Sequence, residues 1–201
     1  MQFPNAQEGV QKIYKAEILM LIGAVAALLG VIFGAIGGGA LILTAIFVIA
    51  AAVLAIIAFI MNISGVNRAA KDEQAFKSAL YALLIGIVAS AVVGGFSSNG
   101  VVSGLANTVS TICEFLVSYY VCTGIINLAA ILKDDAVGEK GKKTRSLLMI
   151  VWICSAVLKA LSAILSAGFG TVLGIFAGIL SIVAYIMYLG LLKNAAVMLK
   201  E

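Results

Sequence analysis

The chain has 201 residues, of which 63% are hydrophobic and 11% are charged, and its formal net charge is +4. A soluble domain carries roughly a quarter of charged residues on average, so this composition excludes a water-soluble globular fold and indicates a protein embedded in lipid. The length allows about six membrane spans of roughly 20 residues each, and we expect no separate soluble domain.

Six apolar segments predict six transmembrane helices, and therefore an all-α polytopic membrane protein that forms a single domain over residues 1–201. In chain order the segments are Glu17–Ile36, Leu41–Ser64, Ala79–Phe96, Leu105–Leu132, Ser146–Ala167 and Thr171–Leu192. A helix satisfies its own backbone hydrogen bonds inside lipid, which makes it the expected conformation for each segment.

The basic residues predict the orientation of these helices. Every lysine and arginine except Lys159 lies in the N-terminal segment, in alternate connections, or near the C-terminus. The remaining connections, near residues 37–39, 97–104 and 168–170, carry no charge. Because basic loops stay on the cytoplasmic side, both termini are predicted to be cytoplasmic. The positive charge thus indicates orientation in a membrane, which we expect to be the bacterial cytoplasmic membrane, and not nucleic-acid binding.

The chain also contains three similar stretches, at approximately residues 11–76, 77–143 and 144–201. They begin with "YKAEILMLIGAV", "FKSALYALLIGIV" and "TRSLLMIVWICSAV", and each ends in a polar segment. Combined with the charge pattern, this repetition predicts three helical hairpins of the same orientation. Parallel repeats of this kind differ from the inverted repeats of many secondary transporters.

Glycines recur at every fourth position in two of the predicted spans. The first run is Gly30, Gly34 and Gly38, and the second is Gly170, Gly174 and Gly178. This spacing places each run on one helix face, where two backbones can approach closely. The runs therefore predict glycine zippers for helix packing within the protein, with a contact to a second copy or to another membrane subunit as the alternative use.

Two neighbouring spans carry polar stripes with opposite charges. Residues on one face of the fourth span are Asn107, Thr111, Glu114 and Ser118, and those on one face of the fifth span are Ser155, Lys159, Ser162 and Ser166. Ionisable side chains are costly inside a bilayer and commonly mark functional sites. We therefore expect the stripes to face each other, so that Glu114 and Lys159 interact directly or through water.

These residues leave two interpretations of function. The first is permeation or transport of an ion or small solute past the polar stripe. The second is a non-transporting scaffold, accessory subunit or stress-related protein in which Glu114 and Lys159 form a structural ion pair. Because the chain has no histidine and no metal-ligand, phosphate-loop or nucleophile motif, we expect no enzymatic activity, no cofactor and no bound metal. Lipid is the expected surrounding in either case.

Overall fold

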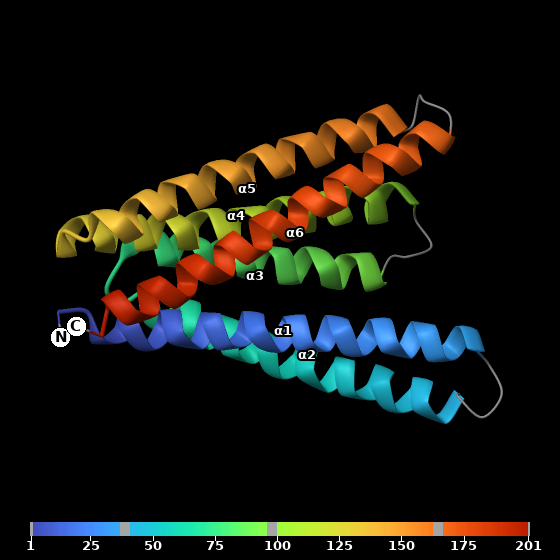
Figure 1. Cartoon of the computed structure of the whole chain (residues 1–201), viewed down its shortest axis with the longest axis horizontal. Coiled ribbons are helices and arrows are strands. Elements are labelled where there is room, and N and C mark those ends of the chain that lie inside the picture. The colour runs from blue at the N-terminus through green and yellow to red at the C-terminus, as the bar shows by residue number, and fades with distance from the viewer. Residues whose placement is uncertain (1, 37–40, 96–99, 163–166, 201) are drawn as a thin grey trace.

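The computed structural model describes residues 2–36, 41–95, 100–162 and 167–200, with the side chains of residues 94, 100–101, 158–162 and 167–177 outside this description. All regular secondary structure in these ranges is helical (Figure 1). The helices are α1 (Pro4–Ile36), α2 (Leu41–Ala69), α3 (Gln74–Gly95), α4 (Gly100–Leu132), α5 (Asp135–Ser162) and α6 (Ala167–Met198). The prediction of an all-helical protein is confirmed.

Among the described residues, the five helices α1, α2, α3, α4 and α6 are long and apolar enough to cross a membrane. Helix α5 begins in the charged segment that precedes the fifth predicted span. The architecture is thus that expected of a helical membrane protein. The orientation of the helices in the bilayer stays a prediction.

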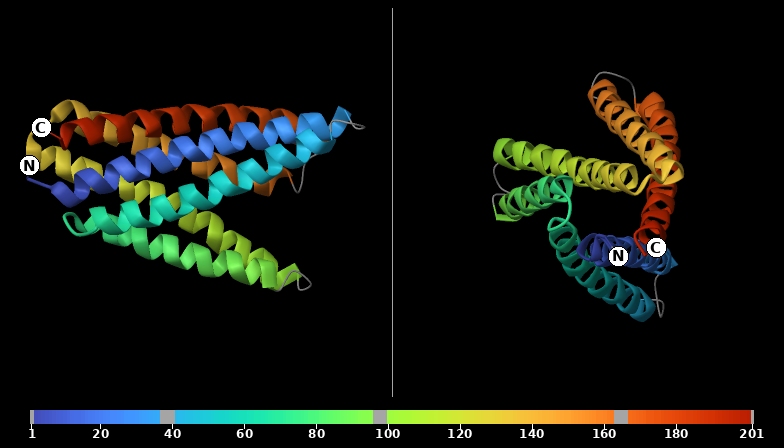
Figure 2. Two further views of the ribbon diagram at one scale, coloured as in Figure 1. Left: turned by 90° about the horizontal axis from the view of Figure 1, so that it is seen from below. Right: turned by 90° about the vertical axis from the view of Figure 1, so that its left-hand side faces the viewer.

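Consecutive helices run antiparallel, and both termini lie at the same end of the molecule (Figure 1). From that end the pairs α1–α2, α3–α4 and α5–α6 spread apart, and the end-on view in Figure 2 shows them pointing in three directions. Side chains are packed most densely at the end of the molecule where the helix pairs meet. Large side chains that are completely buried, such as Phe76, Ile125 and Leu191, belong to one hydrophobic cluster near the termini.

Toward the opposite end, many apolar side chains are not covered by protein. Val31 is 69% exposed on α1, Ile42 is 71% exposed on α2, and Val88 is 65% exposed on α3. Continuous apolar surface of this extent is rare on soluble proteins but is compatible with contact to lipid chains. The cluster near the termini therefore holds the helices together, while the diverging halves present an apolar exterior.

Helices α1 and α2 approach each other most closely at Gly9 and Gly65. A Cβ atom added at Gly9 would lie 2.5 Å from the carbonyl oxygen of Gly65 and 2.6 Å from the backbone nitrogen of Ala69. Farther along the pair, the rings of Phe33 and Phe47 stack with centroids 5.6 Å apart. Small residues at the crossing thus let the backbones touch, and aromatic rings fill the wider separation beyond it.

The glycines of the predicted zippers differ in their surroundings. A Cβ atom at Gly30 would lie 3.2 Å from Val48, and one at Gly34 would lie 3.5 Å from Thr44, so both face α2. Gly178 has no atom within 4 Å of such a Cβ position among the described residues. Gly38, and the surroundings of Gly170 and Gly174, lie outside the described residues. The zippers as functional packing motifs stay a prediction.

The first turn of α1 is held by a carboxylate from the connection between α2 and α3. Helix α1 begins at Pro4, a favoured first helical residue because its missing N–H would have no partner there. Asp72 Oδ2 accepts a hydrogen bond from the Ala6 backbone N–H at 2.8 Å, and Oδ1 accepts one from Asn5 Nδ2 at 2.9 Å. The carboxylate satisfies a first-turn donor and complements the positive end of the helix dipole.

Asp72→Ala should therefore destabilise the protein by about 1 kcal/mol, the typical cost of losing a helix cap. The measurement is the midpoint of unfolding when the purified protein is titrated with sodium dodecyl sulfate in mixed micelles. Asp135→Ala is the matched control, because Asp135 complements the dipole at the start of α5 but is exposed, so its loss should shift the midpoint less. An equal shift of the midpoint in both variants would contradict a capping role for Asp72.

Candidate functional site

The polar residues predicted to share one face of α4 divide between its surface and a cavity. Glu114 and Ser118 line the cavity, while Asn107 is exposed and Thr111 is half-buried. The hydroxyls of Thr111 and Ser118 donate to the backbone carbonyls of Asn107 at 3.0 Å and of Glu114 at 3.4 Å. These two hydroxyls therefore satisfy their own hydrogen bonding within the helix.

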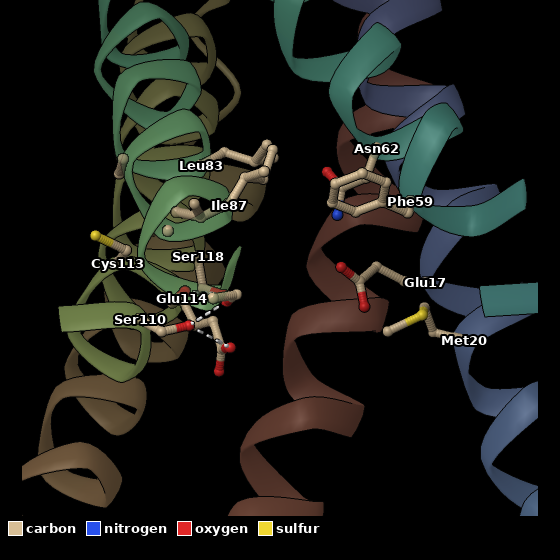
Figure 3. A pocket seen from close by; sticks show the side chains of 14 residues that line it. Glu17, Met20, Phe59, Asn62, Leu83, Ile87, Ser110, Cys113, Glu114 and Ser118 are labelled. Carbon is tan, nitrogen blue, oxygen red and sulfur yellow. Dashed lines mark hydrogen bonds between the residues drawn. The ribbon is translucent and has the colours of Figure 1, made fainter. Parts of the chain in front are cut away.

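The cavity lies between α1–α2 on one side and α3–α4 on the other, and its volume is about 470 Å³ (Figure 3). Its polar lining comes from all four helices and consists of Glu17, Asn62, Ser90, Ser110, Glu114 and Ser118. Its apolar lining includes Met20, Phe59, Leu83, Ile87 and Val117. Figure 3 shows the side chains of Glu17 and Glu114 directed toward the same space from opposite sides. The fold thus brings two carboxylates to one cavity.

Glu17 is positioned by a tyrosine of α6. The hydroxyl of Tyr185 lies 2.9 Å from the backbone carbonyl oxygen of Glu17 and 3.1 Å from its Oε2, and it can donate to either acceptor. This contact joins α1 and α6, two helices that are far apart in sequence. The hydroxyl proton can bond to only one of these acceptors at a time, but both oxygens lie beside it, so the contact between α1 and α6 positions the Glu17 carboxylate.

Glu114 is connected to α3 through two serines. Ser110 Oγ donates to Glu114 Oε1 at 3.5 Å, and it forms a second hydrogen bond of 2.9 Å with Ser90 Oγ. Ser110 is buried, whereas Glu114 is exposed to the cavity. The long bond to Ser110 leaves most of the hydrogen-bonding capacity of the carboxylate open to a ligand or to water.

No ion pair to Glu17 or Glu114 occurs within the part of the chain that the structure describes. The side chains of Lys159 and Ser162, and the whole of Ser166, lie outside it, while Ser155 is half-buried on α5. The pairing of Glu114 with Lys159 therefore stays a prediction.

The described contacts between α4 and α5 lie on a neighbouring face of α4. Phe115 stacks on Trp152 with ring centroids 5.0 Å apart. Arg145 lies over the ring of Tyr119 at 5.4 Å and donates to Thr123 Oγ1 at 3.3 Å. These contacts join the two helices through aromatic rings and a cation–π interaction, and leave Glu114 directed to the cavity on the side of α1 and α3.

Sequence reasoning missed four polar residues of the cavity, namely Glu17, Asn62, Ser90 and Ser110. The predicted first span begins at Glu17, although an acid at the start of a long apolar run is itself a signal of function. Asn62 is a polar residue inside an otherwise apolar segment and gives a similar signal. Ser90 and Ser110 offered no signal of comparable strength, because serine is common in membrane helices and often bonds to its own backbone.

The chain thus belongs to the class of all-helical proteins that have several helices able to cross a membrane, here with a cavity lined by two carboxylates. No protein family, curated protein or solved structure matches it. Among the described residues, no group of three or more histidine, cysteine or acidic side chains is placed to hold a metal ion.

Proposed function

We propose that this chain is a six-helix protein of the bacterial cytoplasmic membrane, with cytoplasmic termini, and that it lets an ion or small solute cross past Glu17 and Glu114. The observation that carries the proposal is the cavity of about 470 Å³, which carboxylates from two different helix pairs line together. Two acidic side chains among apolar helices are costly to maintain, and in membrane proteins such groups mark ion and substrate pathways.

The expected depths of the two carboxylates support a pathway. At 1.5 Å per helical residue, Glu17 lies about 28 Å from the Ile36 end of α1, and Glu114 lies about 21 Å from the Gly100 end of α4. In a hydrocarbon core of about 30 Å, Glu17 would then lie near the cytoplasmic boundary and Glu114 closer to the middle. Charges at successive depths would allow a cation to pass from one carboxylate to the other.

The alternative is a non-transporting scaffold or accessory subunit, which would contact a second copy or another membrane protein and use Glu114 and Lys159 as a structural pair. The two roles differ in the expected behaviour of variants. For a structural pair, Glu114→Gln destabilises the protein because it leaves the ammonium group of Lys159 without its counter-charge. Adding Lys159→Met then restores most of the stability. For a pathway, the double variant is folded but has lost its flux.

We expect the result for a pathway, in which the double variant is folded but has lost its flux. The measurement combines detergent unfolding midpoints with cation flux into proteoliposomes for wild type, Glu114→Gln and Glu114→Gln/Lys159→Met. Glu139→Gln is the control, because Glu139 is an exposed carboxylate whose pKa is lowered by its hydrogen bond to Lys142. Wild-type flux together with restored stability in the double variant would reject the transport role of Glu114 and favour the scaffold.

A further inference from the structure

The polar groups of the cavity define the charge of a ligand. Its described lining contains the carboxylates of Glu17 and Glu114 but no lysine or arginine. The other polar lining groups are hydroxyls and one amide, which carry no charge. In an apolar protein interior, two carboxylates attract a positive ligand strongly and repel an anion. The site is therefore electrostatically complementary to a cation.

The apolar part of the lining defines the body of that ligand. Met20 and Phe59 come from α1 and α2, and Leu83 and Ile87 face them from α3. These apolar side chains supply no ligand to a small metal cation, which requires several oxygen ligands in close geometry. They suit an organic cation with a hydrocarbon or aromatic body, and the face of Phe59 could stack on it or attract its charge.

The size of the cavity agrees with such a ligand. Binding sites for drug-sized molecules typically occupy about 300–1,000 Å³ and combine apolar walls with a few polar groups that fix orientation. The cavity, at about 470 Å³, is within this range. An alkali cation or a proton would leave most of that space to water or lipid chains.

Asn62 adds a more specific requirement. Its Oδ1 atom is buried and has no hydrogen-bond partner among the described residues. A buried acceptor without a partner is costly, and buried oxygens in proteins nearly always receive a hydrogen bond. Asn62 lines the same cavity as both carboxylates, but this oxygen is itself covered, so rotation of the Asn62 side chain toward the cavity would present it to an N–H group of a bound ligand.

We infer that the cavity between α1–α2 and α3–α4 binds a lipophilic organic cation that carries N–H donors. The inference rests on the proposed function, because it assigns a substrate class to the same cavity. The carboxylates of Glu17 and Glu114 neutralise the cation, the walls around Phe59 and Leu83 contact its apolar body, and Asn62 accepts one of its N–H groups.

Ethidium is a suitable probe, because it has a permanent positive charge, fused aromatic rings and two arylamine groups that donate N–H hydrogen bonds. Its fluorescence, titrated against purified protein in lipid nanodiscs, should show saturable binding above the signal of empty nanodiscs. Glu17→Gln/Glu114→Gln should weaken this binding at least about tenfold, whereas Glu139→Gln should leave it unchanged. Each single glutamine variant should show part of the loss, and thermal melting verifies that every variant is folded.

Methyltriphenylphosphonium tests the N–H requirement, because it is a lipophilic cation without such a donor. Asn62→Leu should weaken ethidium binding at least about fivefold and change methyltriphenylphosphonium binding by less than about twofold. Equal losses for the two probes would overturn the role of Asn62. Absence of saturable ethidium binding to the wild type, or equal binding to wild type and the double glutamine variant, would overturn the assigned ligand class.

The inference and the proposed function fail in different ways. Flux of a small inorganic cation without ethidium binding would overturn the ligand class and leave transport intact. Saturable ethidium binding that depends on Glu17 and Glu114, without flux of any cation, would support the ligand class and contradict transport.

Discussion

Gly9→Ala should destabilise the protein by about 2 kcal/mol or more, the scale on which overpacking affects tightly packed sites. The added Cβ atom would lie 2.5 Å from the Gly65 carbonyl oxygen and 2.8 Å from the Ala69 Cβ, closer than such atoms can approach. Most of these neighbours belong to the backbone, which cannot move aside as a flexible side chain can. Helices α1 and α2 would have to separate near the hydrophobic cluster that holds the bundle together.

Gly178→Ala makes the same chemical change where the structure predicts the opposite effect. Gly178 is an exposed residue of α6, and no described atom lies within 4 Å of its Cβ position. In a helix interior alanine is favoured over glycine by up to about 1 kcal/mol, so this variant should be neutral or slightly more stable. Unfolding midpoints of the two variants in mixed micelles provide the comparison. A Gly9→Ala midpoint equal to that of wild type would contradict the close approach of α1 and α2.

Glu17→Gln should reduce cation flux at least about tenfold without comparable loss of stability, because it removes the charge nearest the cytoplasmic end of the proposed pathway. The amide keeps nearly the shape of the carboxylate and can still accept the hydrogen bond from Tyr185, so helix packing should persist. The measurement is the initial rate of cation uptake into proteoliposomes that contain equal amounts of folded protein.

Tyr185→Phe separates the charge of Glu17 from its positioning. This variant keeps the carboxylate and removes only the hydroxyl that bonds to Glu17 at 2.9 and 3.1 Å. Its flux should fall less than that of Glu17→Gln. Undiminished flux in folded Glu17→Gln would show that the carboxylate is not part of a pathway.

The helices could be predicted from sequence because long apolar runs in lipid have few other ways to satisfy their backbones. The full lengths of the helices were harder to predict from the sequence. Helix α1 begins at Pro4, ahead of the predicted span at Glu17, because its first turns bury Ala6, Val10 and Ile13 on one face. This spacing is the signature of an amphipathic helix, but a search for continuous apolar segments does not detect it.

The candidate site was predictable only in part. Glu114 is conspicuous as a carboxylate inside an apolar segment, so its sequence context alone identified it as a candidate. Its neighbours across the cavity depend on how two helix pairs are placed, and a single sequence contains no measure of which faces meet. The hydrogen bond from Tyr185 to Glu17 is an example, since it joins residues near opposite ends of the chain.

The central claim is that a cation crosses the membrane through the cavity lined by Glu17 and Glu114. Charge movement across proteoliposomes adsorbed on a solid-supported membrane tests it most directly, with rapid exchange to protons, sodium, potassium, methylammonium or ethidium. Wild-type protein should give a transient current with at least one of these cations, and folded Glu17→Gln/Glu114→Gln should give none. A folded wild-type protein that moves no charge with any of them, or a double variant with wild-type currents, would contradict the claim.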